Sequence, residues 1–162
     1  MFIKVIGAFI AIAAFAALLE TPKNYLKYAG VVGAIGWFVF LLSKEFGVTE
    51  VFATFLSAMS ISIVSHVFAR IFKVPVTVFL VAGILPTVPG AGMYRIAYSI
   101  IEGSKEMTSQ YLMATLELAA AIALGIFVVD AFFRIFQKDF KQNSLKYNKM
   151  NDKAQNASKY GF

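Results

Sequence analysis

The part of this sequence best suited to binding chemistry is residues 83–92, a segment that cannot continue an α-helix. Pro86 and Pro89 each lack an amide hydrogen and clash with the carbonyl four residues back, so the carbonyls of Ala82 and Leu85 should lose their helical partners. Inside a bilayer, such a break is tolerated only where protein or a water-filled cavity satisfies the exposed groups. The segment is therefore either a binding site or a hinge or tight turn.

A helix that starts near Gly92 would point its free amides into the break, and Arg95 would add a positive charge one turn further along. Broken helices of this kind bind carboxylates in membrane transporters, while unwound carbonyls bind cations. The pattern therefore suits an amino acid or a dicarboxylate, if the break is more than a turn.

Two further groups are candidates for carrying a proton. His66 is the single histidine, the residue type that changes charge near neutral pH; it either relays protons or hydrogen-bonds a neighbouring helix. Glu117 is a carboxylate inside an apolar run, and it is either functional or an ion-pair partner for Arg95. Asp130 and Arg134 are four residues apart on one predicted helix, a spacing that predicts a local ion pair.

The composition indicates an integral membrane protein. Of 162 residues, 59% are hydrophobic and 15% charged, whereas soluble domains average about 45–50% apolar and about 25% charged. The chain has no cysteine and one histidine, which excludes disulfides, thiolate chemistry and multi-histidine metal sites within one chain. The net charge is +6, but seven of the fifteen basic residues lie from Arg134 onward, which favours contact with lipid headgroups over nucleic acid.

Hydrophobic runs predict about five transmembrane helices in an all-α bundle, with a transmembrane domain over 1–136 and a polar, basic, mobile tail over 137–162. The first run also has the length of a signal peptide, although Lys4 is its only charge. Gly30, Gly33 and Gly36 predict close helix contacts on the second span. The predicted segments are spans at 2–19, 22–42 and 51–72, a fourth that holds the break, a short amphipathic helix over 93–101, a polar loop at 104–110, and a fifth span at 111–136.

The basic residues predict an orientation. With five spans, Lys4, Lys44, Arg95 and Lys105 fall on one side and the other eleven basic residues on the opposite side. A re-entrant fourth segment would instead give nine against six. Because positive charge concentrates in the cytosol, the stronger bias predicts the amino terminus outside, the tail in the cytosol and the break toward the outer face.

Several segments of the sequence resemble a known family. Residues 83–90, with two prolines and a glycine in the order Pro-x-x-Pro-Gly, are followed by Tyr94, and residues 52–59, Lys73 before Pro75 and Thr21-Pro22 extend the match. These features resemble the short membrane component of the threonine/serine exporter (ThrE-type) family, over about residues 2–136. The resemblance implies a secondary exporter of small carboxylate-bearing metabolites that works with a larger polytopic subunit in the bacterial cell membrane. It does not separate threonine or serine from a dicarboxylate such as succinate.

Residues and resemblance together predict a subunit of an exporter coupled to the proton motive force, with Glu117 or His66 carrying the proton. The alternative is a non-transporting assembly or scaffold subunit of a membrane complex. No Gly-x-Ser-x-Gly or His-Glu-x-x-His pattern is present, so we expect no enzyme, and no cofactor or metal. Membrane lipids and a homo- or hetero-oligomeric partner are expected, and nucleic acid is not. The predicted substrate-binding residues are Pro86, Thr87, Pro89, Gly90, Gly92, Tyr94 and Arg95.

Overall fold

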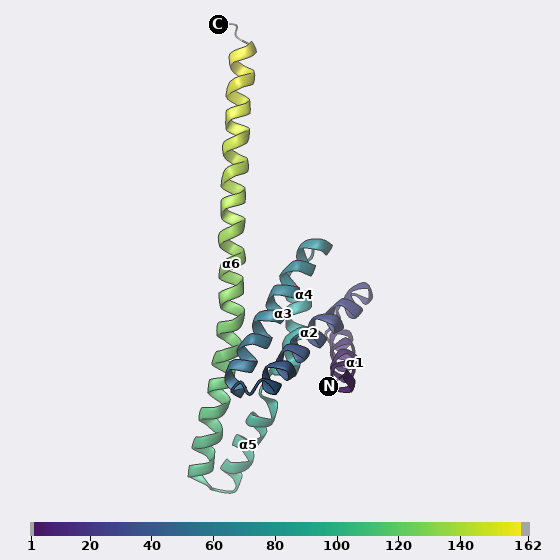
Figure 1. The fold of residues 1–162 in the computed structure, drawn as a ribbon, viewed down its shortest axis with the longest axis vertical. Helices are drawn as coiled ribbons and strands as arrows, with labels where there is room; N and C mark the ends of the chain where they lie inside the picture. Colours follow the sequence, from purple (N-terminus) through teal and green to yellow (C-terminus); the bar gives the residue numbers. More distant parts are fainter. Residues whose placement is uncertain (1, 160–162) are drawn as a thin grey trace. The chain divides into compact units, whose positions relative to one another are not determined.

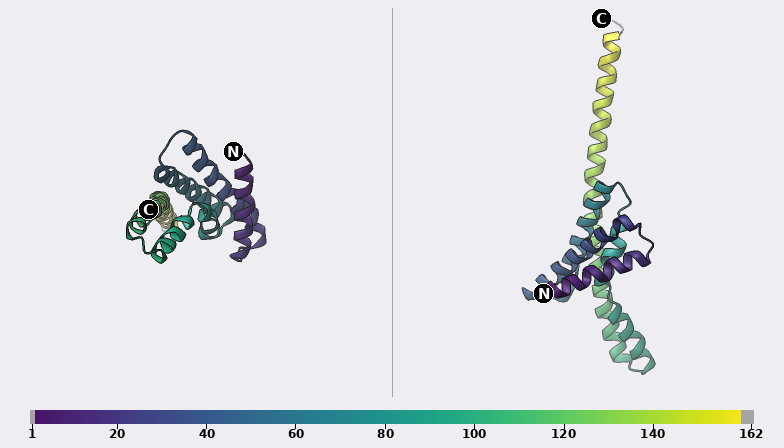
Figure 2. Two further views of the ribbon diagram at one scale, coloured as in Figure 1. Left: turned by 90° about the horizontal axis from the view of Figure 1, so that it is seen from below. Right: turned by 90° about the vertical axis from the view of Figure 1, so that its right-hand side faces the viewer.

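The computed structural model describes the backbone of residues 2–159 and the side chains of residues 3–135. Regular structure among these residues is entirely helical (Figures 1 and 2). The chain divides into two compact units, Met1–Val129 and Asp130–Phe162, and each is described by itself. In chain order the elements are α1 (Phe2–Leu18), the 3₁₀ turn η1 (Lys23–Tyr25), α2 (Leu26–Glu45), α3 (Glu50–Phe72), α4 (Thr77–Ile84), the 3₁₀ turn η2 (Leu85–Thr87), α5 (Gly90–Ile101) and α6 (Lys105–Lys159).

Several of these helices can cross a bilayer. Within the described residues, three are long and apolar enough: Lys23–Glu45, which joins η1 to α2; α3; and Lys105–Ile135 of α6. The pair Thr77–Thr87 and Gly90–Ile101 qualifies together, as one broken span or a re-entrant loop. α1 is apolar but shorter, with 17 residues; it measures about 26 Å, against a hydrocarbon core of about 30 Å. The protein is an all-α, multi-pass membrane protein.

Glycines on α2 let the neighbouring helices approach closely. A side chain at Gly33 would overlap Ile12 of α1, and one at Gly36 would overlap Ile61 of α3. Gly30 likewise faces α1. Ile12 and Ile61 are buried in the hydrophobic core. Because lipid offers no hydrophobic drive between helices, close van der Waals packing of this kind holds the bundle together. The close contacts predicted at these glycines are therefore present.

Aromatic rings close one end of the bundle formed by α2, α3 and α4. Neighbouring ring centroids lie 4.5 to 6.1 Å apart, in tilted and edge-on arrangements. Such geometries add to the packing energy of the rings. Phe79 lies at the centre and is completely buried. We call this group the aromatic cluster; its members are Tyr25, Tyr28, Phe68, Phe72 and Phe79.

The buried face of α3 is lined with hydroxyl groups. The Ser57 hydroxyl donates a hydrogen bond of 2.8 Å to the Gly36 carbonyl, which links α3 to α2. The hydroxyls of Ser62 and Ser65 are buried and have no hydrogen-bond partner among the described residues. His66 lies on the same face, with its Nδ1 3.0 Å from the Ser62 carbonyl. A polar stripe therefore runs through an otherwise apolar bundle.

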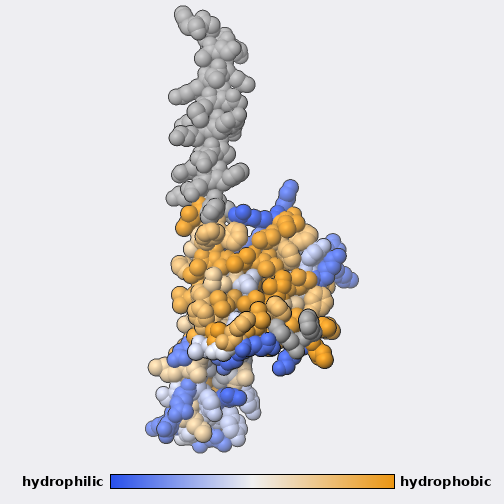
Figure 3. All heavy atoms as spheres, viewed as in Figure 1, coloured by the Kyte–Doolittle hydropathy of each residue, from blue (hydrophilic) through white to orange (hydrophobic). Residues whose placement is uncertain are grey.

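α5 and the first turns of α6 form an antiparallel hairpin. Gly103 has φ +73°, a left-handed conformation that ends α5, and the amides of Gly103 and Ser104 donate to the carbonyls of Ile100 and Ser99. The predicted polar loop at 104–110 is wrong, because α6 begins at Lys105. Figure 3 shows a hydrophobic surface over α1–α4 and a more hydrophilic surface over this hairpin.

The second unit contains the carboxyl-terminal part of α6. Arg134 Nε lies 2.8 Å from Asp130 Oδ2, so the predicted local ion pair is confirmed. The helix continues to Lys159, through most of the residues predicted as a polar, basic tail. The side chains of residues 137–159 and residues 160–162 of that predicted tail lie outside the described residues.

Candidate functional site

Residues 85–89 separate α4 from α5, and the helical segment Thr77–Thr87, which is α4 with η2, is bent by 53° relative to α5. The carbonyls of Ala82 and Leu85 are not left free, in contrast to the expectation from the two prolines. The amide of Leu85 donates to Ala82, and the amide of Val88 donates to Leu85 over 3.3 Å. Tight 3₁₀ hydrogen bonds thus replace the helical ones, and these two carbonyls are already satisfied.

Among the described residues, two backbone amides next to the break have no backbone partner. The Gly90 amide donates to Val88 and the Met93 amide to Pro89, whereas the amides of Ala91 and Gly92 have no backbone acceptor among the described residues. They belong to the first turn of α5, where the helix dipole places partial positive charge. The break therefore offers donors for an anion.

A cavity of about 430 Å³ adjoins the break, and we call it the break cavity. Its wall comes from α2, the first residue of α3, the break, α5 and α6, all within the first unit. Gly92 allows the α5–α6 wall to close, because a side chain there would overlap Thr115 of α6. The residues that give the cavity its chemical character are Trp37, Glu50, Arg95, Tyr111 and Thr115.

The break cavity contains one charge of each sign. The Arg95 guanidinium lies 5.8 Å from the centre of the Tyr111 ring, a cation–π contact that holds it at the wall. Glu50 is the first residue of α3, where a carboxylate also interacts favourably with the helix dipole. Both charged side chains are exposed to solvent. The wall of the cavity therefore carries one cationic and one anionic side chain.

The structure brings together six of the residues predicted from the sequence and leaves three apart. Tyr94 is 70% exposed and stacks on Tyr98, on a different side of α5. His66 is buried on α3, and Glu117 is exposed on α6; neither lines the break cavity. The predicted residues that line it are Pro86, Thr87, Pro89, Gly90, Gly92 and Arg95.

Glu117 and Arg95 do not form an ion pair among the described residues. The α6 side chains that line the break cavity are at positions 111, 114, 115 and 118, a spacing that defines one face of a helix. Glu117 lies on another face and precedes the uncharged stretch 118–129. Helical phase therefore separates the two residues that the sequence suggested as partners.

Sequence reasoning missed Glu50. It follows the short connection between α2 and α3, and only the folded chain brings it to the break. The predicted orientation could have indicated that Glu50 lies near the break, because it places the loop before Glu50 on the same side of the membrane as the break. Within the residues that the structure describes, no group of three or more His, Cys, Asp or Glu side chains is placed to hold a metal ion.

A multi-pass helical membrane protein with a charged cavity at a broken helix has the architecture of a transporter. Comparison with known families agrees: the sequence profile described as "Threonine/Serine exporter, ThrE" matches residues 4–132. The chain belongs to this family, which is a family of transporters. The match includes every residue that lines the break cavity. No solved structure matches the chain.

Proposed function

We propose that this protein is a subunit of a secondary exporter of small α-amino acids such as threonine and serine, with the break cavity as its substrate site. The observation that carries the proposal is that Arg95 and Glu50 line one cavity. A zwitterionic amino acid would place its carboxylate at Arg95 and its ammonium group at Glu50. Charge-assisted hydrogen bonds of this kind are about twice as strong as neutral ones.

The start of α5 supports the same orientation. The free amides of Ala91 and Gly92 belong to the wall that also carries Arg95. A substrate carboxylate there would accept hydrogen bonds from the amides and face the guanidinium, while the helix dipole adds to the attraction. A dicarboxylate such as succinate would place its second negative charge in a cavity that contains Glu50. An amino acid fits these charges better.

The coupling proposed for this exporter is to the proton motive force, and Glu117 and His66 remain the predicted proton carriers. Neither lines the break cavity. Their protonation would act on the substrate through the positions of α6 and α3, and not by direct contact. A larger polytopic subunit of the same family is the partner proposed for export.

For the membrane arrangement we propose five spans in the bacterial cell membrane: α1, α2, α3, the broken pair α4 and α5, and α6. The amino terminus is outside and the carboxyl terminus in the cytosol. Lys4 and Lys44 line one small cavity, which fits their predicted position on the same side. Labelling that placed both termini in the cytosol would contradict this orientation.

Export and competition measurements test the substrate assignment. Cells that co-express the chain with the larger subunit are loaded with labelled threonine, and efflux is compared for wild type, Glu50→Gln and a control, Lys105→Ala. Lys105 is an exposed cation that does not line the cavity. We expect Glu50→Gln to weaken competition by serine and to leave or strengthen competition by succinate. Equal competition profiles in wild type and Glu50→Gln would contradict the assignment.

The alternative, a non-transporting scaffold subunit, makes a different prediction for the break. The chain has no cysteine, so single cysteines at positions 87 to 92 are clean probes. In an export pathway these cysteines react with a water-soluble maleimide, and threonine slows the reaction. In a scaffold whose break is covered by a partner, they stay protected in the assembled complex.

A further inference from the structure

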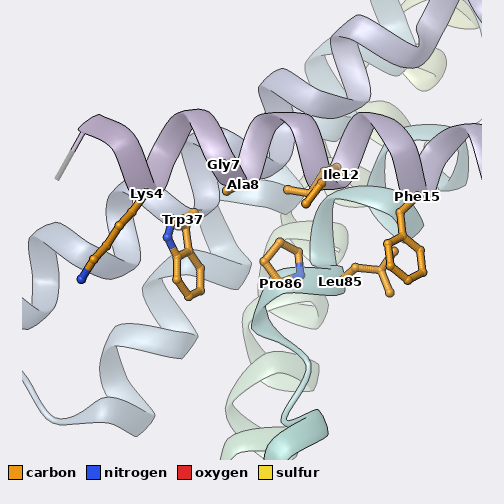
Figure 4. A pocket seen from close by; sticks show the side chains of 9 residues that line it. Lys4, Gly7, Ala8, Ile12, Phe15, Trp37, Leu85 and Pro86 are labelled. Carbon is orange, nitrogen blue, oxygen red and sulfur yellow. The ribbon is translucent and has the colours of Figure 1, made fainter.

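A second cavity lies on the other side of the break, between α1 and η2. It measures about 520 Å³ and its wall is apolar apart from Lys4. Small residues of α1, namely Gly7, Ala8 and Ala11, form part of the wall, and a side chain added at Gly7 would meet nothing within 4 Å. We call this cavity the α1 groove. Figure 4 shows Lys4 and Phe15 toward its two ends, with Pro86 and Leu85 opposite α1.

The dimensions of the α1 groove match one leaflet of a bilayer. Lys4 and Phe15 are eleven positions apart on α1, which corresponds to about 16 Å of helix. Half of a hydrocarbon core of about 30 Å is about 15 Å. A lipid whose acyl chain ends beside Phe15 would therefore have its headgroup at the level of Lys4.

The charged side chains at the mouth of the α1 groove, which is its Lys4 end, favour an anionic lipid headgroup. Lys4 is the only charged residue of α1, and it also lines a smaller cavity together with Lys44 and Glu45. This smaller cavity, which shares Lys4 with the α1 groove, has two cations and one anion and so a net positive charge. One lysine near a membrane surface raises the affinity for an anionic lipid by roughly five-fold. A zwitterionic headgroup would gain little from this mouth.

From the groove, its length and its charged mouth, we propose that this protein has a binding site for an anionic phospholipid, with one acyl chain in the α1 groove and the phosphate at Lys4 and Lys44. Trp37 and Pro86 line both the α1 groove and the break cavity. The bound lipid therefore touches the reverse side of two residues that form the cavity wall. The site does not depend on the identity of the exported molecule.

Trp37 provides the test, because it is the only tryptophan of the chain and lies at the groove. The full chain is reconstituted in vesicles of phosphatidylcholine and phosphatidylglycerol at equal fractions, with brominated acyl chains on one lipid at a time. Bromine quenches tryptophan fluorescence on contact. We expect brominated phosphatidylglycerol to quench more, with a relative affinity for it of roughly five-fold or more over phosphatidylcholine.

Matched variants separate the two parts of the site. Lys4→Ala and Lys44→Ala should each reduce the preference for phosphatidylglycerol several-fold, whereas Lys105→Ala should not change it. Gly7→Phe should fill the groove and reduce quenching by either lipid. Ile6→Phe is its control, because Ile6 is 59% exposed and does not line the groove. Circular dichroism in the same vesicles confirms that each variant is helical.

Two results would overturn the proposal. Equal quenching by both brominated lipids in wild type, unchanged in Lys4→Ala, would show no selective site. Absence of quenching by either lipid would show that protein covers the groove, from a second copy or another subunit. Threonine export is not measured here, so failure of this site and failure of the proposed substrate site remain distinguishable.

Discussion

The two ends of the α1–α4 bundle differ in how they fill space. At one end the aromatic cluster packs five rings together, with the buried Phe79 in contact with three of the others. At the other end, prolines and glycines interrupt the helix, and two cavities of about 430 and 520 Å³ share Trp37 and Pro86 as a common wall. Large rings with defined edge-on contacts seal the bundle, whereas residues that disrupt helical hydrogen bonding leave it open.

We expect the aromatic end of the bundle to contribute mainly to stability and the end with the break to contribute mainly to binding. The aromatic cluster contributes packing and carries no charge, so changes there should affect unfolding first. The break contributes Arg95, Glu50 and free amides, and its charged side chains are exposed, so changes there should affect export first. The following variants test whether the two ends divide their tasks in this way.

The largest effect is expected for Arg95→Ala. In the proposed function a bound substrate covers the Arg95 guanidinium, and truncation of one partner of a buried, hydrogen-bonded charge pair costs about 2–5 kcal/mol, so export of threonine should fall by roughly 30-fold or more. Stability should change little, because Arg95 is exposed. Efflux of labelled threonine from cells that also express the larger subunit measures this, with Lys105→Ala as the control. Export at the wild-type rate by Arg95→Ala would exclude the break cavity as a carboxylate site.

Phe79→Ala tests the sealed end. In water such a truncation costs about 3–5 kcal/mol, but in lipid only the packing part is lost, so we expect about 2 kcal/mol in the free energy of unfolding. Unfolding in mixed micelles with increasing sodium dodecyl sulfate measures it. Phe127→Ala is the matched control, because Phe127 is 67% exposed. Equal losses for the two variants would mean that the aromatic cluster has no special role.

Two glycines of the break offer a sharper comparison. A methyl group at Gly92 would overlap Thr115, whereas one at Gly90 would meet nothing within 4 Å. We expect Gly92→Ala to cost about 1–2 kcal/mol and Gly90→Ala to be neutral or slightly stabilising. The loss should shrink when Thr115→Ala is added, and a double-mutant cycle of unfolding free energies measures this coupling. Additive effects of the two changes would show that the contact does not form.

The smallest effect concerns two serines of α3. Ser57 bonds the Gly36 carbonyl, and Ser62 has no hydrogen-bond partner among the described residues. Side-chain hydrogen bonds between membrane helices average about 0.6 kcal/mol, so Ser57→Ala should lose about that amount. Ser62→Ala should cost nothing, because it removes a hydroxyl that has no partner. If Ser62→Ala lowered the free energy of unfolding more than Ser57→Ala in the same assay, Ser62 and not Ser57 would be the serine with the stabilising hydrogen bond.

The sequence predicted those features that follow from local chemistry. Prolines at 86 and 89 had to interrupt a helix, glycines on α2 had to allow close contacts, and Asp130 and Arg134 had to be neighbours on one helix face. Each of these depends on residues close together in the chain. The membrane class followed from composition for the same reason.

The features that the sequence could not give depend on the folded chain. The polar residues 104–110 were predicted to form a loop, yet a helix outside the apolar bundle tolerates residues 105–110. Glu50 joined the break cavity only through the packing of α3 against α2, and Glu117 was separated from Arg95 by helical phase. Sequence spacing does not report these positions.

The hydrogen bonds of residues 82–90 have a mechanical consequence. Because Pro86 and Pro89 have no amide hydrogen, a change in the angle between α4 and α5 breaks no bond at these two positions. The amides of Leu85, Val88 and Gly90 donate to carbonyls only two or three residues back, and the bond from Val88 to Leu85 is 3.3 Å long. We therefore expect this segment to act as a hinge whose 53° bend is set by what α5 touches, beginning with Thr115 against Gly92.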